Sequence, residues 1–131
     1  RLLSGLGSSI YPKNVDYSLI DDVVWADDEP AFAGSWHLAA KEGVFAGGSS
    51  GAVYFAALKV AMELGKGKRV VCMLPDSGAK YYDTVYSQDW LQEKEINVTR
   101  PIGEYIERLV KRELSGEAKT QLYAVQAQGV E

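Results

Sequence analysis

The residues best suited by type and spacing to bind a ligand or take part in a reaction are 47–51 (GGSSG). They directly precede an apolar segment typical of a buried helix. Glycines at such a position let the backbone approach a ligand closely. A helix N-terminus also presents N–H donors that have no partner within the helix. A tight turn with Ser49 or Ser50 as the helix N-cap explains the same pattern without a ligand. Spacing alone therefore leaves both a ligand site and a turn open.

Two catalytic motifs that share parts of this stretch are not supported by the rest of the sequence. A phosphate-binding loop would need GK[ST] after the glycines, and that is missing. The spacing from Gly47 to Gly51 matches a G-x-S-x-G nucleophile elbow, but no acid and base are placed to complete it. The single histidine, His37, lies on a predicted amphipathic helix, where a structural role is favoured over catalysis.

A second candidate region follows the apolar run at residues 70–74 (VVCML), where Pro75, Asp76, Ser77 and Gly78 break the pattern. Ligands of α/β proteins bind at the carboxyl ends of parallel strands, which is where Asp76 and Ser77 would lie. A turn uses the same residue types for backbone reasons. The pattern favours neither interpretation.

The elements that must position these residues alternate between strand and helix. Short apolar runs predict strands at 20–26, 44–46 and 70–74, the last covered on both faces. Helices are predicted from Asp27 or Asp28 to Gly43, and from Ser50 to Leu64, the second apolar almost all round and therefore buried. An amphipathic helix begins at Pro101 and ends at Gly116. The fold class is α/β, with a parallel sheet flanked by helices.

The composition describes an ordinary globular chain. Its 131 residues carry a net charge of −4, which argues against nucleic acid and anionic membranes as partners. One cysteine and one histidine exclude a disulfide framework and a multi-Cys or multi-His metal site. Two or three strands are too few for a complete doubly wound sheet, and the chain opens on Arg1 rather than Met. We therefore expect it to be part of a longer protein.

Read in order, several motifs resemble the fold-type II pyridoxal-phosphate enzymes, with cysteine synthases and cystathionine β-synthases as the nearest relatives. These motifs are the Gly5-Leu6-Gly7 turn, Pro12, Ile20-Asp21, Gly43, residues 46–51 and 74–78, and Tyr81 or Tyr82. The resemblance covers about residues 1–90. Within the family, residues 45–48, 82–87 and Trp90-Leu91 look most like siderophore-type synthases of the 2,3-diaminopropionate pathway, which join O-phosphoserine to glutamate.

The resemblance implies a role for individual residues. Ser49 matches the serine that hydrogen-bonds the pyridine nitrogen of pyridoxal 5'-phosphate, while Gly47 and Gly48 let the backbone approach the ring. Pro75 and Asp76 would line the same rim. Gly5 and Gly7 match a loop that closes over the substrate. The family's Schiff-base lysine lies in an N-terminal motif absent from this sequence, so no catalytic residue is expected in this segment.

The resemblance also implies a function and an organisation. We expect part of a β-replacement enzyme that acts on O-acetyl- or O-phosphoserine through an aminoacrylate, is cytoplasmic, and is a homodimer when complete. Residues 1–95 would belong to the large, cofactor-binding domain, and residues 96–131 would form a C-terminal helical extension and tail. The alternative is a non-catalytic fragment or interaction module of the same fold. A partner supplying the missing N-terminal portion would distinguish the two.

Overall fold

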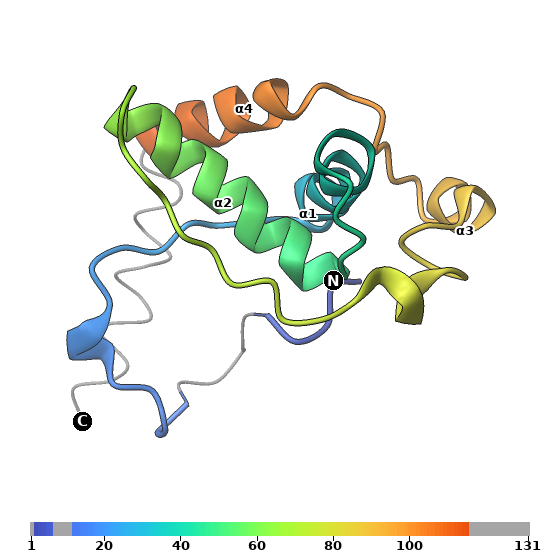
Figure 1. Cartoon of the computed structure of the whole chain (residues 1–131), viewed down its shortest axis with the longest axis horizontal. Helices are drawn as coiled ribbons and strands as arrows, with labels where there is room; N and C mark the ends of the chain where they lie inside the picture. Colours follow the sequence, from blue (N-terminus) through green and yellow to red (C-terminus); the bar gives the residue numbers. More distant parts are fainter. Residues whose placement is uncertain (1, 7–11, 116–131) are drawn as a thin grey trace.

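Helices dominate the part of the chain that the structure describes. The computed structural model describes residues 2–6 and 12–115, and Figure 1 shows two central helices with a third lying across them. The α-helices of this part are α1 (Asp28–His37), α2 (Gly48–Leu64), α3 (Gln88–Glu93) and α4 (Ile102–Leu114). A π-helical turn, Leu38–Glu42, extends α1, and 3-10 turns form at Tyr17–Leu19 and Gly78–Tyr81. Within these residues no helix has the length and apolar character needed to cross a membrane.

Helix α1 begins where the sequence predicts, and the π-helical turn that extends it ends at the predicted Gly43. Asp27 is its N-cap, and the acidic side chains of Asp28 and Glu29 lie in its first turn, where they interact favourably with the helix dipole. Gly43 ends the following turn with a φ of 67°, a left-handed conformation that suits glycine. The Asp28 carboxylate also accepts hydrogen bonds from the backbone N–H groups of Leu2 and Leu3, each at 2.7 Å. It thereby joins the N-terminal segment to the start of α1.

Helices α1 and α2 cross at a pair of glycines. A Cβ atom on Gly34 would lie 2.3 Å from the carbonyl oxygen of Gly51, and one on Gly51 would lie 2.0 Å from that of Ala31. Ser35, fully buried beside this crossing, donates its hydroxyl to the carbonyl oxygen of Gly47 at 3.0 Å. The start of α2 is therefore held directly against α1.

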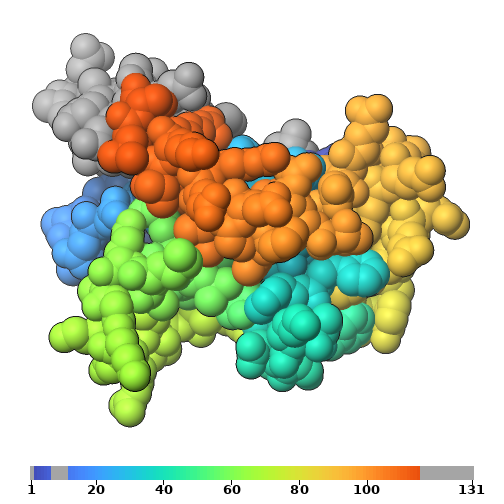
Figure 2. Space-filling view, turned by 90° about the horizontal axis from the view of Figure 1, so that it is seen from above, coloured from blue at the N-terminus to red at the C-terminus, as the bar shows by residue number. Residues whose placement is uncertain are grey.

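Helix α4 covers the other end of this pair, as Figure 2 shows in orange above the green of α2. Its buried side chains Tyr105, Ile106 and Leu109 pack with Ala33 of α1 and Phe55 of α2. This accounts for the amphipathic pattern that predicts the helix, which runs from Ile102, just after Pro101, to Leu114, two residues before the predicted end.

An ion pair adds to the α2–α4 contact. The Nζ atom of Lys59 on α2 lies 2.9 Å from Glu63 and 3.1 Å from Glu113 of α4, with only 5% of the lysine side chain exposed. Burial by itself lowers the pKa of Lys59, but hydrogen bonds to the two carboxylates outweigh it and leave that pKa raised. The lysine therefore stays charged and connects the two helices.

The predicted strands do not form in the described residues, whose single bridge joins Ala46 and Ser77 in antiparallel orientation. A strand requires a neighbour for its N–H and C=O groups, and residues 20–26 and 70–74 have none here. The run at 70–74 keeps an alternating exposure, with Val71 88% and Met73 79% exposed. Helix α2 is also less buried than its composition predicts, since Met62 and Leu64 are exposed.

The glycine crossing predicts an unequal effect of two alanine substitutions. In the full-length protein, Gly51→Ala should lower the free energy of unfolding by about 1–3 kcal/mol or more, because α1 must move away from the new methyl group. Gly103→Ala meets nothing within 4 Å on α4 and should raise stability by roughly 0.5–1 kcal/mol. Urea unfolding of both variants measures the difference. Equal stability would show that the crossing is not tightly packed.

Candidate functional site

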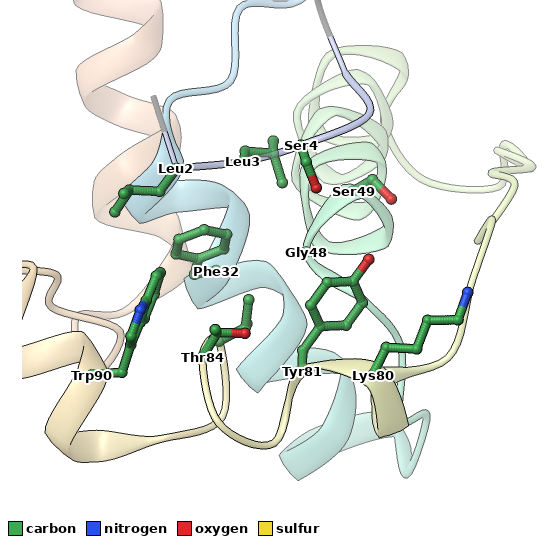
Figure 3. A pocket seen from close by; sticks show the side chains of 11 residues that line it. Leu2, Leu3, Ser4, Phe32, Gly48, Ser49, Lys80, Tyr81, Thr84 and Trp90 are labelled. Atoms are coloured by element: carbon green, nitrogen blue, oxygen red, sulfur yellow. The ribbon is translucent and has the colours of Figure 1, made fainter.

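A cavity of about 260 Å³ lies at the N-terminal end of α2, between the N-terminal segment, α1 and residues 80–90. Figure 3 shows Ser4, Ser49 and Tyr81 on one side of it and Phe32 and Trp90 on the other. The lining therefore combines hydroxyl groups with aromatic rings, which suits a flat polar ligand. Its residues are Leu2, Leu3, Ser4, Phe32, Gly48, Ser49, Lys80, Tyr81, Thr84, Val85 and Trp90.

The serines around the α1–α2 crossing have different partners. Ser35 and Ser50 are fully buried, and each donates its hydroxyl to a backbone carbonyl, that of Gly47 at 3.0 Å and that of Asp76 at 3.4 Å respectively. Ser49 is half-buried, lines the cavity and has no hydrogen bond from its hydroxyl to any described residue. Ser49 is thus the serine of this turn whose hydroxyl is available to a ligand.

The segment before α2 is held against residues 76–78. Gly47 donates its N–H to the carbonyl oxygen of Asp76 at 3.1 Å, and Gly78 donates to that of Phe45, also at 3.1 Å. The hydroxyl of Tyr86 donates to the carbonyl oxygen of Ala46 at 2.5 Å. These bonds place the two candidate regions of the sequence side by side and fix the direction in which α2 begins.

The two carboxylate oxygens of Asp76, beside this turn, have different surroundings. Its Oδ2 atom accepts the hydroxyl of Tyr81 at 2.7 Å and lies 3.9 Å from the Nζ of Lys80, whereas its buried Oδ1 has no hydrogen-bond partner among the described residues. A Cβ on Gly47 would lie 2.1 Å from that Oδ1, so only glycine fits there. The hydrogen bond to Asp76 raises the pKa of Tyr81, with a smaller contribution from burial.

The residues implicated by sequence do not all reach the cavity. Gly48 and Ser49 line it, while Gly47 and Asp76 lie behind it, against Tyr81. Pro75 is exposed and is not part of the lining.

Two further sequence predictions concern the loop and the cap. Gly5 has a φ of 84°, next to the lining residue Ser4, and Gly7 lies outside the described residues. The N-cap of α2 is Gly47, so the interpretation of Ser49 or Ser50 as the cap of this helix is wrong. The helix starts two residues earlier than expected because Ser35 and Asp76 fix the Gly47 peptide groups.

Reasoning from the sequence gave no role to several lining residues. Phe32 belongs to the predicted helix α1, where its spacing indicates only a core position, and Thr84 lies in the 82–87 stretch, whose resemblance assigns it no role of its own. Trp90 and Tyr81 appear in the family resemblance, but nothing in their spacing predicts that they face Ser49. The available signal was the cluster of aromatic residues at 81–90, directly after the Asp76 turn.

Comparison with known proteins identifies the family of this chain. The family described as pyridoxal-phosphate dependent enzyme matches residues 1–76. The chain belongs to this family. It is 43% identical over 91 residues to the N-(2-amino-2-carboxyethyl)-L-glutamate synthase of Ralstonia nicotianae (strain ATCC BAA-1114 / GMI1000). That match covers 70% of this chain and 27% of the relative, so the chain spans about a quarter of the relative's length. The resemblance to pyridoxal-phosphate enzymes is confirmed.

The cavity of this family member has a lining that fits an aromatic ring with a polar atom. The Ser49 hydroxyl, which has no partner among the described residues, lies at the start of α2, and close-packed glycines keep side chains away from the first turn of this helix. At Gly48 a Cβ would approach Phe32 and Leu3 to 3.0–3.1 Å. An aromatic heterocycle with one polar ring atom matches such a surface.

The Asp76–Tyr81 contact predicts a measurable change in titration. Asp76→Asn should lower the pKa of Tyr81 toward its ordinary value, because the hydrogen bond to the carboxylate is the main cause of the shift. The pKa of Tyr86 is raised chiefly by burial and should not change, which makes it an internal control. NMR of protein with ¹³Cζ-labelled tyrosine follows both residues. An unchanged Tyr81 would contradict the assigned contact.

Proposed function

We propose that this chain forms the pyridine-nitrogen side of the cofactor site in a β-replacement enzyme that uses pyridoxal phosphate. The substrate class is a serine activated at its hydroxyl, as O-acetyl- or O-phosphoserine. The bond between the β-carbon and acetate or phosphate breaks, and a bond to a nucleophile replaces it. The single observation that carries the proposal is the Ser49 hydroxyl, which faces the cavity without a partner among the described residues.

The chemistry of Ser49 suits this reaction. Pyridoxal phosphate, when bound, supplies an electron sink for negative charge at the α-carbon of the substrate. A serine hydroxyl donates a neutral hydrogen bond to the ring nitrogen and leaves that nitrogen largely unprotonated, whereas an aspartate would hold a proton there. A weaker electron sink favours loss of the β-substituent over other outcomes. Gly48 would lie beside the ring, with Gly47 and Asp76 behind the cavity wall and Pro75 outside the lining.

We propose the identity of the nucleophile by analogy with the similar Ralstonia protein. The name of the Ralstonia synthase implies a product in which the amino nitrogen of glutamate carries a 2-amino-2-carboxyethyl group. By analogy, this protein would join the β-carbon of the activated serine to the amino group of glutamate. Gly5, whose positive φ lies next to the cavity-lining Ser4, would allow the N-terminal segment to close over the substrate, together with Gly7.

The same proposal gives the chain its place in a larger fold. Residues 1–95 would contribute to the large cofactor domain of a homodimeric, cytoplasmic enzyme, and residues 96–131 would be a C-terminal extension. In that fold residues 70–74 would be a central strand of a parallel sheet. Their alternating exposure, and the apolar side chains of Val71 and Met73 that face solvent here, support this placement.

Substitution of Ser49 tests the proposal. In the full-length enzyme, Ser49→Ala should reduce turnover of the activated serine by roughly tens of fold, the cost of one hydrogen bond to the reacting system. The cofactor should remain bound, because other groups hold its phosphate. Ser49→Asp should reduce turnover further by protonating the ring nitrogen.

The control for this test is Ser18→Ala, which removes an exposed hydroxyl bonded to Asp16 and should not change the rate. Steady-state kinetics give turnover, and the visible absorbance of the protein reports bound cofactor. Full activity in both Ser49 variants would contradict the assignment. Failure of every form of the intact protein to bind pyridoxal phosphate would instead favour a non-catalytic module.

Substitution in the 70–74 run tests the proposed strand. In the full-length protein, Val71→Asp should destabilise the fold by several kcal/mol, because a central strand would bury an unpaired charge. Lys68→Asp, at an exposed position just before the run, is the control and should change stability little. Thermal unfolding of both variants is the measurement. A stable Val71→Asp protein would show that the run is peripheral.

A further inference from the structure

A second cavity, of about 240 Å³, lies between the start of α1, the middle of α2 and one face of α4. Rings and aliphatic groups form most of its wall, among them Trp25, Phe55, Tyr105 and Leu109. None of its lining residues belongs to the Ser49 cavity. It is therefore a separate hollow with an apolar body.

Both acidic side chains in its wall are already paired. The Asp27 carboxylate accepts a hydrogen bond from the indole N–H of Trp25 at 2.7 Å and one from Arg112 at 3.1 Å. The Glu29 carboxylate lies 3.6 Å from the guanidinium of Arg100. Neither carboxylate is therefore free to receive a cationic ligand without losing an existing contact.

The basic side chains of the wall are not equally engaged. Arg112, besides its bond to Asp27, lies with its guanidinium 5.8 Å from the centre of the Trp25 ring. Arg108, which also lines the cavity, has no ion pair or hydrogen bond within the described residues. Burial, together with the neighbouring Glu29 carboxylate, raises the pKa of Tyr105, so its hydroxyl stays neutral. Arg108 is thus an exposed cation beside apolar walls, and no carboxylate of the described residues pairs with it.

We propose that this cavity binds a small aromatic carboxylate. Its carboxylate would pair with Arg108, whose planar guanidinium matches two oxygens at once, and its ring would lie against Trp25 and Phe55. A cavity of about 150 Å³ is known to accept benzene, so about 240 Å³ holds one ring with a short acidic arm.

Calorimetric titration of the full-length protein with phenylacetate tests this site. Phenylacetamide has the same shape without the charge, and we expect it to bind at least about tenfold more weakly. Arg108→Gln should remove that difference. Lys111→Gln is the matched control, because it removes one positive charge from an exposed position of α4 that does not line the cavity. It should leave the affinity for phenylacetate unchanged.

A second variant separates the cavity from a general charge effect. Trp25→Ala removes a ring that is 42% exposed and should weaken binding of phenylacetate and phenylacetamide alike, by about tenfold. Circular dichroism checks that each variant is folded. Equal affinity for the acid and the amide in the unsubstituted protein, or unchanged binding in Arg108→Gln or in Trp25→Ala, would overturn the proposal. So would the absence of any binding up to about 10 mM ligand.

Discussion

The close approach of α1 and α2 at Gly34 and Gly51 is the constraint on which the described structure depends. With a Cβ on either residue, the carbonyl groups of the other helix would be 2.0–2.3 Å away, so the helices could not pack at this separation. The close packing brings Ser35 within hydrogen-bonding distance of the Gly47 carbonyl and thereby sets where α2 begins. Ser49 faces the cavity because of that starting point. The site is therefore a consequence of helix packing at Gly51, which is only two residues along α2 from Ser49.

Most of the buried polar side chains around this helix packing have hydrogen-bond or ion-pair partners. Ser35 and Ser50 satisfy backbone carbonyls around the Gly47 turn, and Lys59 satisfies two carboxylates where α4 meets α2. Each of these groups would be costly to bury alone, and each is paired. Two polar groups of the α2 turn differ: the Ser49 hydroxyl and the Asp76 Oδ1 atom lack partners among the described residues. Of the two, the Ser49 hydroxyl lines the cavity and is the group that we propose contacts the cofactor.

Two cavities share α1 and α2 as walls. Ser49 and Phe55 are six residues apart on α2, which corresponds to about 9 Å along the helix axis. One cavity combines hydroxyl groups and rings, and the other combines rings with the Arg108 guanidinium, which is unpaired among the described residues. Helix α4 lines only the second cavity, so it forms a cavity wall as well as core contacts.

The sequence by itself determined the family, the three long helices and the importance of the GGSSG turn, because glycines, caps and apolar spacing are local signals. Gly43 ends its helix through its own backbone freedom, and Pro101 precedes another, without help from distant residues. The strands at 20–26 and 70–74 could not be judged in this way, since a strand exists only through hydrogen bonds to a neighbour that the sequence does not name. Tertiary structure alone decided that Gly47 caps α2, that Asp76 lies behind the cavity, and that Phe32, Tyr81, Thr84 and Trp90 surround Ser49. These residues are up to 58 positions apart (from 32 to 90), and only the packing of α1 against α2 and the 80–90 segment brings them together.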